Sequence, residues 1–337
     1  MKAAVLLGPH DLQLVERPMP VPAAGTVVMK VKAVGICGSD GHAYHGKLAT
    51  VQYPRVIGHE VVGEISAVGP GVTGFVVGDH AVLDPVVSCG ECPACRKGRG
   101  NVCAQVKCMG VAAEGGCAEY VELPVKNVHK IPANISWRDA VLMEPYTVGA
   151  QIVAQGQVAA GDLMFIAGAG TIGLVVLQAA KRLGAKVIVS DPVENRLARA
   201  KTLNADVTIN PTKVDVAQAV AEFTGGNGFD VGVDAVGMPA LLEQLVEMAS
   251  PTGRIVVIGF NPAAAQLPQL PITRKELEIH GSRMHAGKFP AVIDWVAKGE
   301  VQTAPLVSHE FRFEDIQAAF DLLDKSPETT CKVILTF

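Results

Sequence analysis

The sequence predicts an α/β protein with two domains, one rich in β-strands and one built as a doubly wound parallel sheet. The chain has 337 residues, more than one hydrophobic core usually serves. Residues 1–148 are rich in Val, Gly and Pro and contain short strand-like runs. Residues 149–281 instead alternate continuous apolar runs with helical stretches, as doubly wound domains do. These observations favour an N-terminal barrel-like domain followed by a cofactor-binding domain.

In the first domain, residues 27–32 and 61–68 are expected to form strands. The apolar start of the chain breaks at Gly8-Pro9, which favours a first strand over a signal peptide. After residue 281, helices are expected at 290–298 and 313–323. A final strand is expected at 332–335, and we expect residues 282–337 to return to the first domain.

In the second domain, four apolar runs have the length and continuity of buried parallel strands. They are residues 163–167, 186–190, 229–234 and 254–259.

Composition excludes some classes of function. Hydrophobic residues make up 49% of the chain, but no apolar run reaches the ~18–20 residues that a membrane span needs. The net charge is −4, which disfavours binding to nucleic acid. Eight cysteines, four of them in one cluster, agree better with a reducing compartment than with a disulfide framework. We therefore expect a cytoplasmic protein that neither binds nucleic acid nor enters a membrane.

Four cysteines are spaced as ligands of one zinc ion: Cys89, Cys92, Cys95 and Cys103, within a lobe of about residues 88–108. Four protein ligands leave no open position, so this site is expected to be structural. The alternative is four reduced thiols in a loop, which the tight spacing disfavours.

A glycine-rich segment follows the run 163–167 and opens a helical stretch, as the dinucleotide fingerprint requires. Its residues are Gly168, Gly170, Thr171, Ile172 and Gly173. The glycines allow a tight turn, close approach of the backbone to a pyrophosphate, and close packing of helix on strand.

Asp191 ends the next strand, close to the ~20-residue interval at which an acid bonds the ribose 2′-hydroxyl. Its charge would repel a 2′-phosphate, so we expect NAD rather than NADP. The alternative role of Asp191 is a helix N-cap before Pro192. Arg196 beside the adenosine ribose and Ile258 are further expected cofactor contacts.

A second metal site is expected from one thiolate, one imidazole and one carboxylate. The candidate ligands are Cys37 and His59 with Glu60 or Glu144. This mixed set leaves a position for water or substrate, as catalytic zinc requires. Each residue alone has a structural alternative, but their occurrence together beside a nicotinamide site favours catalysis. An open zinc position can acidify an alcohol and so favour hydride transfer to nicotinamide.

Together these motifs resemble the zinc-dependent medium-chain dehydrogenase/reductase family over essentially the full length. The resemblance implies a GroES-like catalytic domain (1–148 and 282–337) and a Rossmann domain (149–281). Cys37 with the acidic Glu144 resembles the polyol, threonine and sugar-acid branch. Further stretches are similar to bacterial starvation-sensing-type oxidoreductases, some of which oxidise C5 of hexonates such as L-gulonate or galactonate. These stretches are residues 54–60, 84–90, 288–290 and 331–337.

The resemblance also implies roles for single residues. Ser39 would contact the reacting oxygen and His42 would carry the proton outward, although His42 can equally be a surface histidine. A sugar acid needs a cation for its carboxylate, and Arg283 or Lys288 can supply it; either can also be a solvated charge. Tyr44 is expected either to line the pocket or to pack in the core. The family further implies two zinc ions per subunit and a homodimer or homotetramer.

Two alternatives remain at this stage. One is an L-threonine 3-dehydrogenase or a sorbitol-type dehydrogenase, which differs in the charge of its substrate. The other is an NAD-binding regulator without turnover. A zinc ribbon for nucleic acid is disfavoured by the acidic balance and by a lobe without interleaved aromatic residues.

Overall fold

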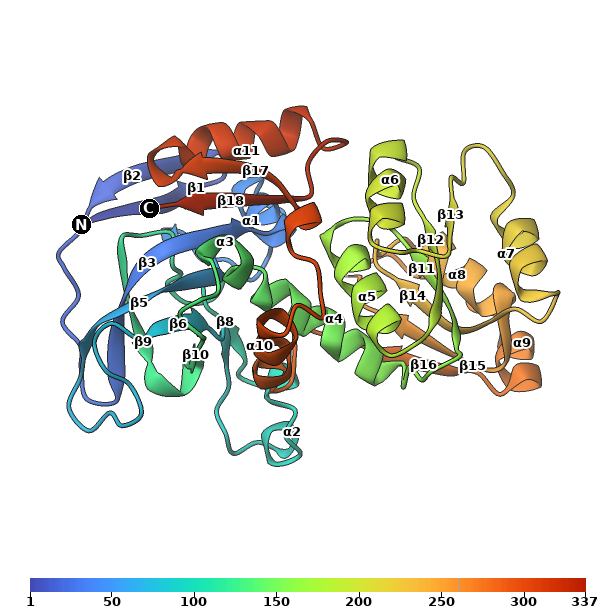
Figure 1. Cartoon of the computed structure of the whole chain (residues 1–337), viewed down its shortest axis with the longest axis horizontal. Helices are drawn as coiled ribbons and strands as arrows, with labels where there is room; N and C mark the ends of the chain where they lie inside the picture. Colours follow the sequence, from blue (N-terminus) through green and yellow to red (C-terminus); the bar gives the residue numbers. More distant parts are fainter. Residues whose placement is uncertain (260) are drawn as a thin grey trace. The chain divides into compact units, whose positions relative to one another are not determined.

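The computed structural model describes residues 1–259 and 261–337. The chain divides into two compact units, each built from more than one segment (Figure 1). Unit 1 comprises Met1–Glu144, Ala286–Gly299 and Val307–Phe337, and unit 2 comprises Pro145–His285 and Glu300–Leu306. Residues 282–337 were expected to return to the first domain, but residues 282–285 and 300–306 belong to unit 2.

Hydrogen bonds explain where segment 300–306 lies. The backbone carbonyl of Gln302 accepts hydrogen bonds from Tyr146 Oη (3.0 Å) and Gln178 Nε2 (3.1 Å). Its backbone N–H donates to Gln178 Oε1 at 2.6 Å. Gln178 is buried in unit 2, so pairing with Gln302 satisfies a buried amide that would otherwise be costly.

Unit 1 is β-rich, as expected. Its main sheet has the strand order β10-β6-β5-β3-β18-β17, with β9 paired to β3. These strands are β3 (Thr26–Ile36), β5 (Glu60–Val68), β6 (His80–Leu83), β9 (Tyr120–Pro124), β10 (Val128–Lys130), β17 (Val307–Arg312) and β18 (Lys332–Thr336). A second sheet has the order β2-β1-β4, and β7 pairs with β8. Their bounds are β1 (Lys2–Gly8), β2 (Asp11–Glu16), β4 (Arg55–Val56), β7 (Val86–Val87) and β8 (Lys107–Cys108).

The helices of unit 1 are short. They are α1 (Gly38–Tyr44), α2 (Pro93–Arg96), α3 (Trp137–Ala140), α10 (Phe289–Ala297) and α11 (Ile316–Lys325). Helix α11 packs against β17 (Figure 1) and contributes Phe320 to the core that also holds Leu6 and Val333. The helix expected at 313–323 begins instead at Ile316, because residues Phe313–Asp315 form a 3₁₀ turn. Helix α4 (Met143–Gln155) carries the chain from one unit into the other.

Unit 2 is the doubly wound domain. All neighbouring strands are parallel, in the order β13-β12-β11-β14-β15-β16. The strands are β11 (Leu163–Ala167), β12 (Lys186–Ser190), β13 (Val207–Ile209), β14 (Phe229–Asp234), β15 (Ala249–Val257) and β16 (Glu278–Gly281). The expected α/β fold with a parallel sheet is therefore confirmed. Strand β15 ends at Val257, so Ile258 follows the strand instead of lying within it.

Helices cover both faces of this parallel sheet (Figure 1). Their bounds are α5 (Thr171–Arg182), α6 (Glu194–Thr202), α7 (Val216–Thr224), α8 (Pro239–Met248) and α9 (Gln269–Lys275). Successive side chains of β11 point to opposite faces of the sheet. Phe165 lies in the core with Leu245 of α8, whereas Ile166 lies on the face covered by α5, near Gly173. Burial on both faces explains why these strands read as continuous apolar runs.

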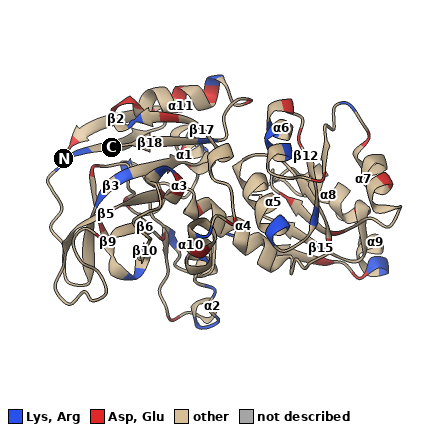
Figure 2. Cartoon of the chain, viewed as in Figure 1, with Lys and Arg blue, Asp and Glu red and all other residues tan. Residues whose placement is uncertain are grey.

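Charged residues of both signs are intermixed along the ribbons of each unit, for example on α6 and α11 (Figure 2). No helix in the described ranges combines the length and apolarity that a membrane crossing requires.

Candidate metal centres and cofactor site

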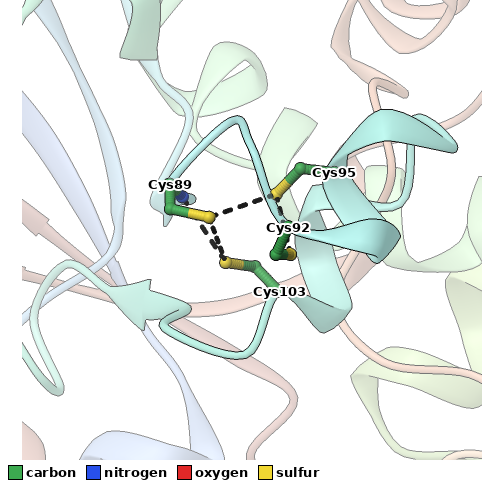
Figure 3. Close-up of side chains that lie close together, drawn as sticks. All are labelled: Cys89, Cys92, Cys95 and Cys103. Carbon is green, nitrogen blue, oxygen red and sulfur yellow. Dashed lines mark hydrogen bonds between the residues drawn. The ribbon is translucent and has the colours of Figure 1, made fainter.

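The four clustered cysteines converge in space. They lie in the excursion between β7 and β8, around α2, and their sulfurs face one another (Figure 3). The Sγ–Sγ distances are 3.9 Å for Cys89–Cys95, 3.5 Å for Cys92–Cys95 and 3.4 Å for Cys103–Cys89. Zinc–sulfur bonds of about 2.3 Å in a tetrahedron put the sulfurs about 3.8 Å apart, so the group fits a structural zinc ion.

Backbone dipoles prepare this cluster for a cation. Backbone N–H groups of Cys89 and Gln105 donate to Cys103 Sγ at 3.4 and 3.3 Å, and they lower the pKa of Cys103. Donation from the backbone of Cys95 lowers the pKa of Cys92 to about 6. Desolvation and the neighbouring sulfurs raise the pKa of Cys95 to about 11. Part of the cluster is thus anionic near neutral pH, as a zinc cage requires.

The second metal centre is assembled where β3 and β5 pair. Cys37 follows β3, and His59 and Glu60 stand at the start of β5, with Glu60 opposite Gly35 in the antiparallel register. The ligand atoms of Cys37, His59 and Glu60 all lie within 4.8 Å of one another. The structure therefore brings together the thiolate, imidazole and carboxylate predicted from the sequence.

Two observations indicate that this group is suited to a cation. Glu60 Oε2 is buried, and it has no hydrogen-bond partner among the described residues. A Cβ at Gly35 would lie 2.0 Å from the same oxygen, so glycine is required where the carboxylate folds over β3. A buried, unpaired carboxylate oxygen is costly unless a cation or a proton satisfies it.

Lys332 is a component of this centre that the sequence analysis missed. Its Nζ lies 2.5 Å from Glu60 Oε1 and donates to the Ile36 carbonyl at 3.1 Å. Lys332 begins β18, which pairs with β3 and so delivers the ammonium beside the ligands. Burial alone would lower the pKa of Lys332, but the Glu60 and Cys37 charges outweigh it and the pKa is raised. The sequence signal for the role of Lys332 was only that a lysine stands at the start of an apolar strand.

Asp40 organises the same centre from within α1. Its Oδ2 accepts from the Cys37 backbone N–H (2.9 Å) and its Oδ1 from the Gly58 backbone N–H (3.3 Å). Oδ1 also lies 3.6 Å from His59 Nδ1. Burial lowers the pKa of His59, but the charges of Asp40 and Cys37 outweigh burial and raise it well above its usual value. Asp40 thus links the two loops that present Cys37 and His59, and it also went unrecognised in the sequence.

Glu144, the other candidate carboxylate, is buried in α4 but does not belong to the compact ligand group. Its charge still raises the pKa values of Lys332 and Cys108, so it lies within electrostatic range of the centre.

Three of the remaining candidates of unit 1 lie on helix α1, and the fourth lies at the start of α10. Ser39 is half-buried in its first turn, and His42 is exposed. The ring of Tyr44 packs 5.1 Å from that of Phe320, and its hydroxyl accepts from Gln317 Nε2 at 3.1 Å. These contacts correspond to the packing alternative for Tyr44. Lys288 is half-buried at the start of α10.

The glycine-rich segment of unit 2 has the geometry of a dinucleotide loop. Gly168 has φ +103°, which favours glycine, and a Cβ at Gly173 would lie 1.9 Å from the Gly168 carbonyl oxygen. A Cβ at Gly170, by contrast, would meet no atom within 4 Å. Thr171 and Ile172 form the first turn of α5. The backbone beside Gly170 is therefore open at the N-terminus of a twelve-residue helix, a favourable position for phosphate.

Asp191 is hydrogen-bonded to the backbone of the glycine-rich loop. Its Oδ2 accepts from the Ala169 backbone N–H and its Oδ1 from the Val193 backbone N–H, both at 2.9 Å. Arg196 Nη1 lies 3.7 Å from Asp191 Oδ2. The N-cap of the following helix α6 is Val193, so Asp191 does not cap it directly. Ile258 is half-buried just after β15, and Arg283 follows β16.

Comparisons with known proteins agree with this architecture. Residues 23–133 match the family model of the alcohol dehydrogenase GroES-like domain, and residues 171–298 match that of the zinc-binding dehydrogenase. The starvation-sensing protein RspB of Escherichia coli K12 is 42% identical over 100% of this chain and 99% of its own. The 2-dehydro-3-deoxy-L-galactonate 5-dehydrogenase of Pseudoalteromonas atlantica is 34% identical, covering 97% of this chain and 96% of its own.

A solved structure extends the likeness to three dimensions. The rspB protein of E. coli CFT073, complexed with NADH, has a TM-score of 0.96 at 42% identity and covers 100% of this chain and 99% of its own. The two family models, the full-length relatives and the two metal-ligand groups agree with one another, and the chain belongs to the zinc-type medium-chain alcohol and polyol dehydrogenases.

Proposed function

We propose that this enzyme uses NAD and one catalytic zinc ion to oxidise a secondary alcohol of a sugar acid or polyol, such as C5 of L-gulonate or galactonate. The observation that carries the proposal is the convergence of Cys37, His59 and Glu60 within 4.8 Å. Three protein ligands leave one position on a tetrahedral ion for substrate. The relative that acts on 2-dehydro-3-deoxy-L-galactonate supports a sugar acid.

The chain's residues have distinct tasks in this scheme. Cys37, His59 and Glu60 hold the metal. Lys332 orients the Glu60 carboxylate through a hydrogen bond, and Asp40 orients the His59 imidazole through an ionic contact. Bound zinc would supply Lewis acidity at this position, and bound NAD would supply a hydride acceptor. Ser39 contacts the reacting hydroxyl, and the exposed His42 passes its proton to solvent.

Glu60 is the third ligand in this proposal, because its unpaired Oε2 belongs to the compact group and Glu144 does not. Matched variants Glu60→Gln and Glu144→Gln, analysed for zinc by mass spectrometry, separate the two. Loss of the catalytic zinc in Glu60→Gln alone supports the assignment, and loss in Glu144→Gln alone reverses it.

NAD is favoured over NADP because Asp191 stands beside the open backbone at Gly170, through its hydrogen bond to Ala169. A carboxylate fixed in this position accepts hydrogen bonds from the ribose hydroxyls and repels a 2′-phosphate. The complex of rspB with NADH supports the same choice.

We also propose that Arg283 or Lys288 binds the carboxylate of a sugar acid. Both are half-buried, so each keeps solvent access for a charged ligand. Arg283→Met and Lys288→Met should raise KM for a hexonate while leaving KM for neutral sorbitol unchanged. An equal effect on both substrates would remove the residue from this role.

The primary test is NADH formation by zinc-loaded protein on L-gulonate, L-galactonate, D-mannonate, sorbitol, galactitol and L-threonine. Turnover on a hexonate alone, lost with a chelator and in Cys37→Ser, supports the proposal. Turnover on threonine or sorbitol alone retains the reaction and changes the substrate. NAD binding with no turnover on any of them favours the regulator.

We further propose that the protein is cytoplasmic and assembles as a homodimer or homotetramer. Two thiolate-containing clusters fit a cytoplasmic, reducing compartment, and none of the eight cysteines forms a disulfide bond. Strand β16 ends the parallel sheet with its Ile279 side chain 39% exposed, which suits a homodimer or homotetramer that covers this edge. Light scattering coupled to size-exclusion chromatography measures the assembly directly.

A further inference from the structure

We infer that unit 1 carries a third metal site, on its surface, for a late first-row divalent cation such as Ni²⁺, Cu²⁺ or Zn²⁺. Its protein ligands are His10, in the turn between β1 and β2, and His45, at the C-terminus of α1. Asp324 of α11 supports the site by binding the far side of His45. This inference does not depend on the reaction that the enzyme catalyses.

The two imidazoles are already at a ligand spacing. His10 Nε2 and His45 Nδ1 lie 3.4 Å apart, with ring centroids 4.8 Å apart and the planes inclined at 61°. Metal–nitrogen bonds of about 2.0–2.1 Å at a tetrahedral angle put two nitrogens about 3.3–3.4 Å apart. The pair can therefore bind one ion with little movement.

Asp324 supplies the outer contact that metal-binding histidines usually have. Its Oδ1 lies 2.8 Å from His45 Nε2, which leaves Nδ1 as the nitrogen facing His10. A carboxylate that accepts the N–H on one side of an imidazole fixes the tautomer and makes the other nitrogen a better ligand. It also adds negative charge to the surroundings of the site.

The backbone holds these groups in place. His10 has φ +60°, a left-handed conformation that is uncommon for residues other than glycine, and its N–H donates to the Tyr44 carbonyl at 2.8 Å. The buried Tyr44 ring packs edge-on against both imidazoles, with centroids 4.9 Å from His10 and 5.3 Å from His45. Such strain persists only where surrounding contacts enforce it, so the histidine pair is preorganised.

The chemistry of the pair selects the class of ion. Neutral imidazole suits zinc, nickel and copper rather than magnesium or calcium. His10 is exposed, so water can occupy the remaining coordination positions. With two protein ligands, the site should bind more weakly than either cysteine-containing cluster. A bound ion would fasten the β1–β2 turn to α1, the helix that carries Ser39 and His42.

The test uses the full-length enzyme without an affinity tag and with its zinc sites loaded. Ni²⁺ is titrated calorimetrically into the wild type, His10→Asn, His45→Gln and Asp324→Asn; asparagine tolerates the left-handed backbone at position 10. The matched control is His280→Ala, which removes a half-buried histidine that also pairs with a carboxylate, Glu278 at 2.8 Å. Circular dichroism and zinc content verify that each variant is folded.

We expect the wild type and His280→Ala to bind one additional Ni²⁺ per chain. His10→Asn and His45→Gln should weaken that binding at least tenfold, and Asp324→Asn by about 10–100-fold. With Cu²⁺ as the probe, electron paramagnetic resonance should show coupling to two nitrogens in the wild type and to one in either histidine variant. No additional ion in the wild type, or binding unchanged by both histidine variants, overturns the inference.

Discussion

Lys332 Nζ lies 2.5 Å from Glu60 Oε1, and both side chains are almost completely buried, at 2% and 1% exposure. Removing one partner of a buried ion pair leaves an uncompensated charge, which typically costs about 3–5 kcal/mol. Lys332→Met should therefore lower the free energy of unfolding by that amount in urea denaturation, and activity should fall because Glu60 is no longer fixed.

The control for this prediction is Lys130→Met, since Lys130 pairs with Asp79 at 2.8 Å but is half exposed. An exposed pair contributes about 0–1 kcal/mol, so the change should be small. The double variant Lys332→Met/Glu60→Gln should recover part of the lost stability. If Lys332→Met is as stable as the wild type, the buried pair is not a structural element of the centre.

Metal removal should affect the two cysteine-containing groups differently. Cys92→Ser opens the four-sulfur cluster, so zinc should fall from two ions per chain to one and Tm should drop by roughly 4–8 °C, as for a loss of about 2 kcal/mol. Cys37→Ser should also remove one zinc but abolish turnover while Tm stays nearly constant. Metal analysis, scanning calorimetry and NADH formation distinguish the two cases.

Cys331→Ser is the matched control for both variants, because Cys331 belongs to neither ligand group. It should retain two zinc ions, full turnover and the wild-type Tm. Equal losses of turnover in Cys92→Ser and Cys37→Ser would contradict the division into structural and catalytic centres.

Much of this arrangement could be predicted from local sequence. The strands Leu163–Ala167, Lys186–Ser190 and Phe229–Asp234 have the bounds expected, because burial on both sheet faces makes each an uninterrupted apolar run. The four-cysteine cluster was also visible, since its ligands lie within fifteen residues of chain.

Contacts between distant segments could not be predicted. Lys332 reaches Glu60 across 272 positions of sequence, and only the pairing of β18 with β3 places it there. Segment 300–306 likewise belongs to unit 2 through Gln178, 124 positions from Gln302. Periodicity shows which residues are buried, but pairing between strands decides which charges meet.

Cofactor preference should depend on the charge of Asp191. Asp191→Asn keeps an oxygen that can accept from a backbone N–H but removes the repulsion of a 2′-phosphate. The ratio of kcat/KM for NADP to that for NAD should rise at least about tenfold, which corresponds to about 1.4 kcal/mol.

Asp191→Ala should raise the same ratio and also lower stability by about 1–3 kcal/mol, because the N–H groups of Ala169 and Val193 lose their acceptor. Steady-state kinetics with both cofactors, together with urea denaturation, separates the two effects. An unchanged cofactor ratio in both variants would remove Asp191 from discrimination.

Two glycines of the same loop should respond oppositely to alanine. A Cβ at Gly173 would lie 1.9 Å from the Gly168 carbonyl oxygen, so Gly173→Ala must displace the backbone and should lower the free energy of unfolding by about 1–3 kcal/mol. A Cβ at Gly170 meets no atom within 4 Å, so Gly170→Ala should fold with the wild-type stability. If the cofactor phosphates approach the backbone at Gly170, the new methyl group occupies their space, and Kd for NADH should rise at least about tenfold. Fluorescence titration with NADH and urea denaturation of both variants check this. Unchanged NADH binding in Gly170→Ala would place the phosphates elsewhere, because its intact fold excludes unfolding as the reason.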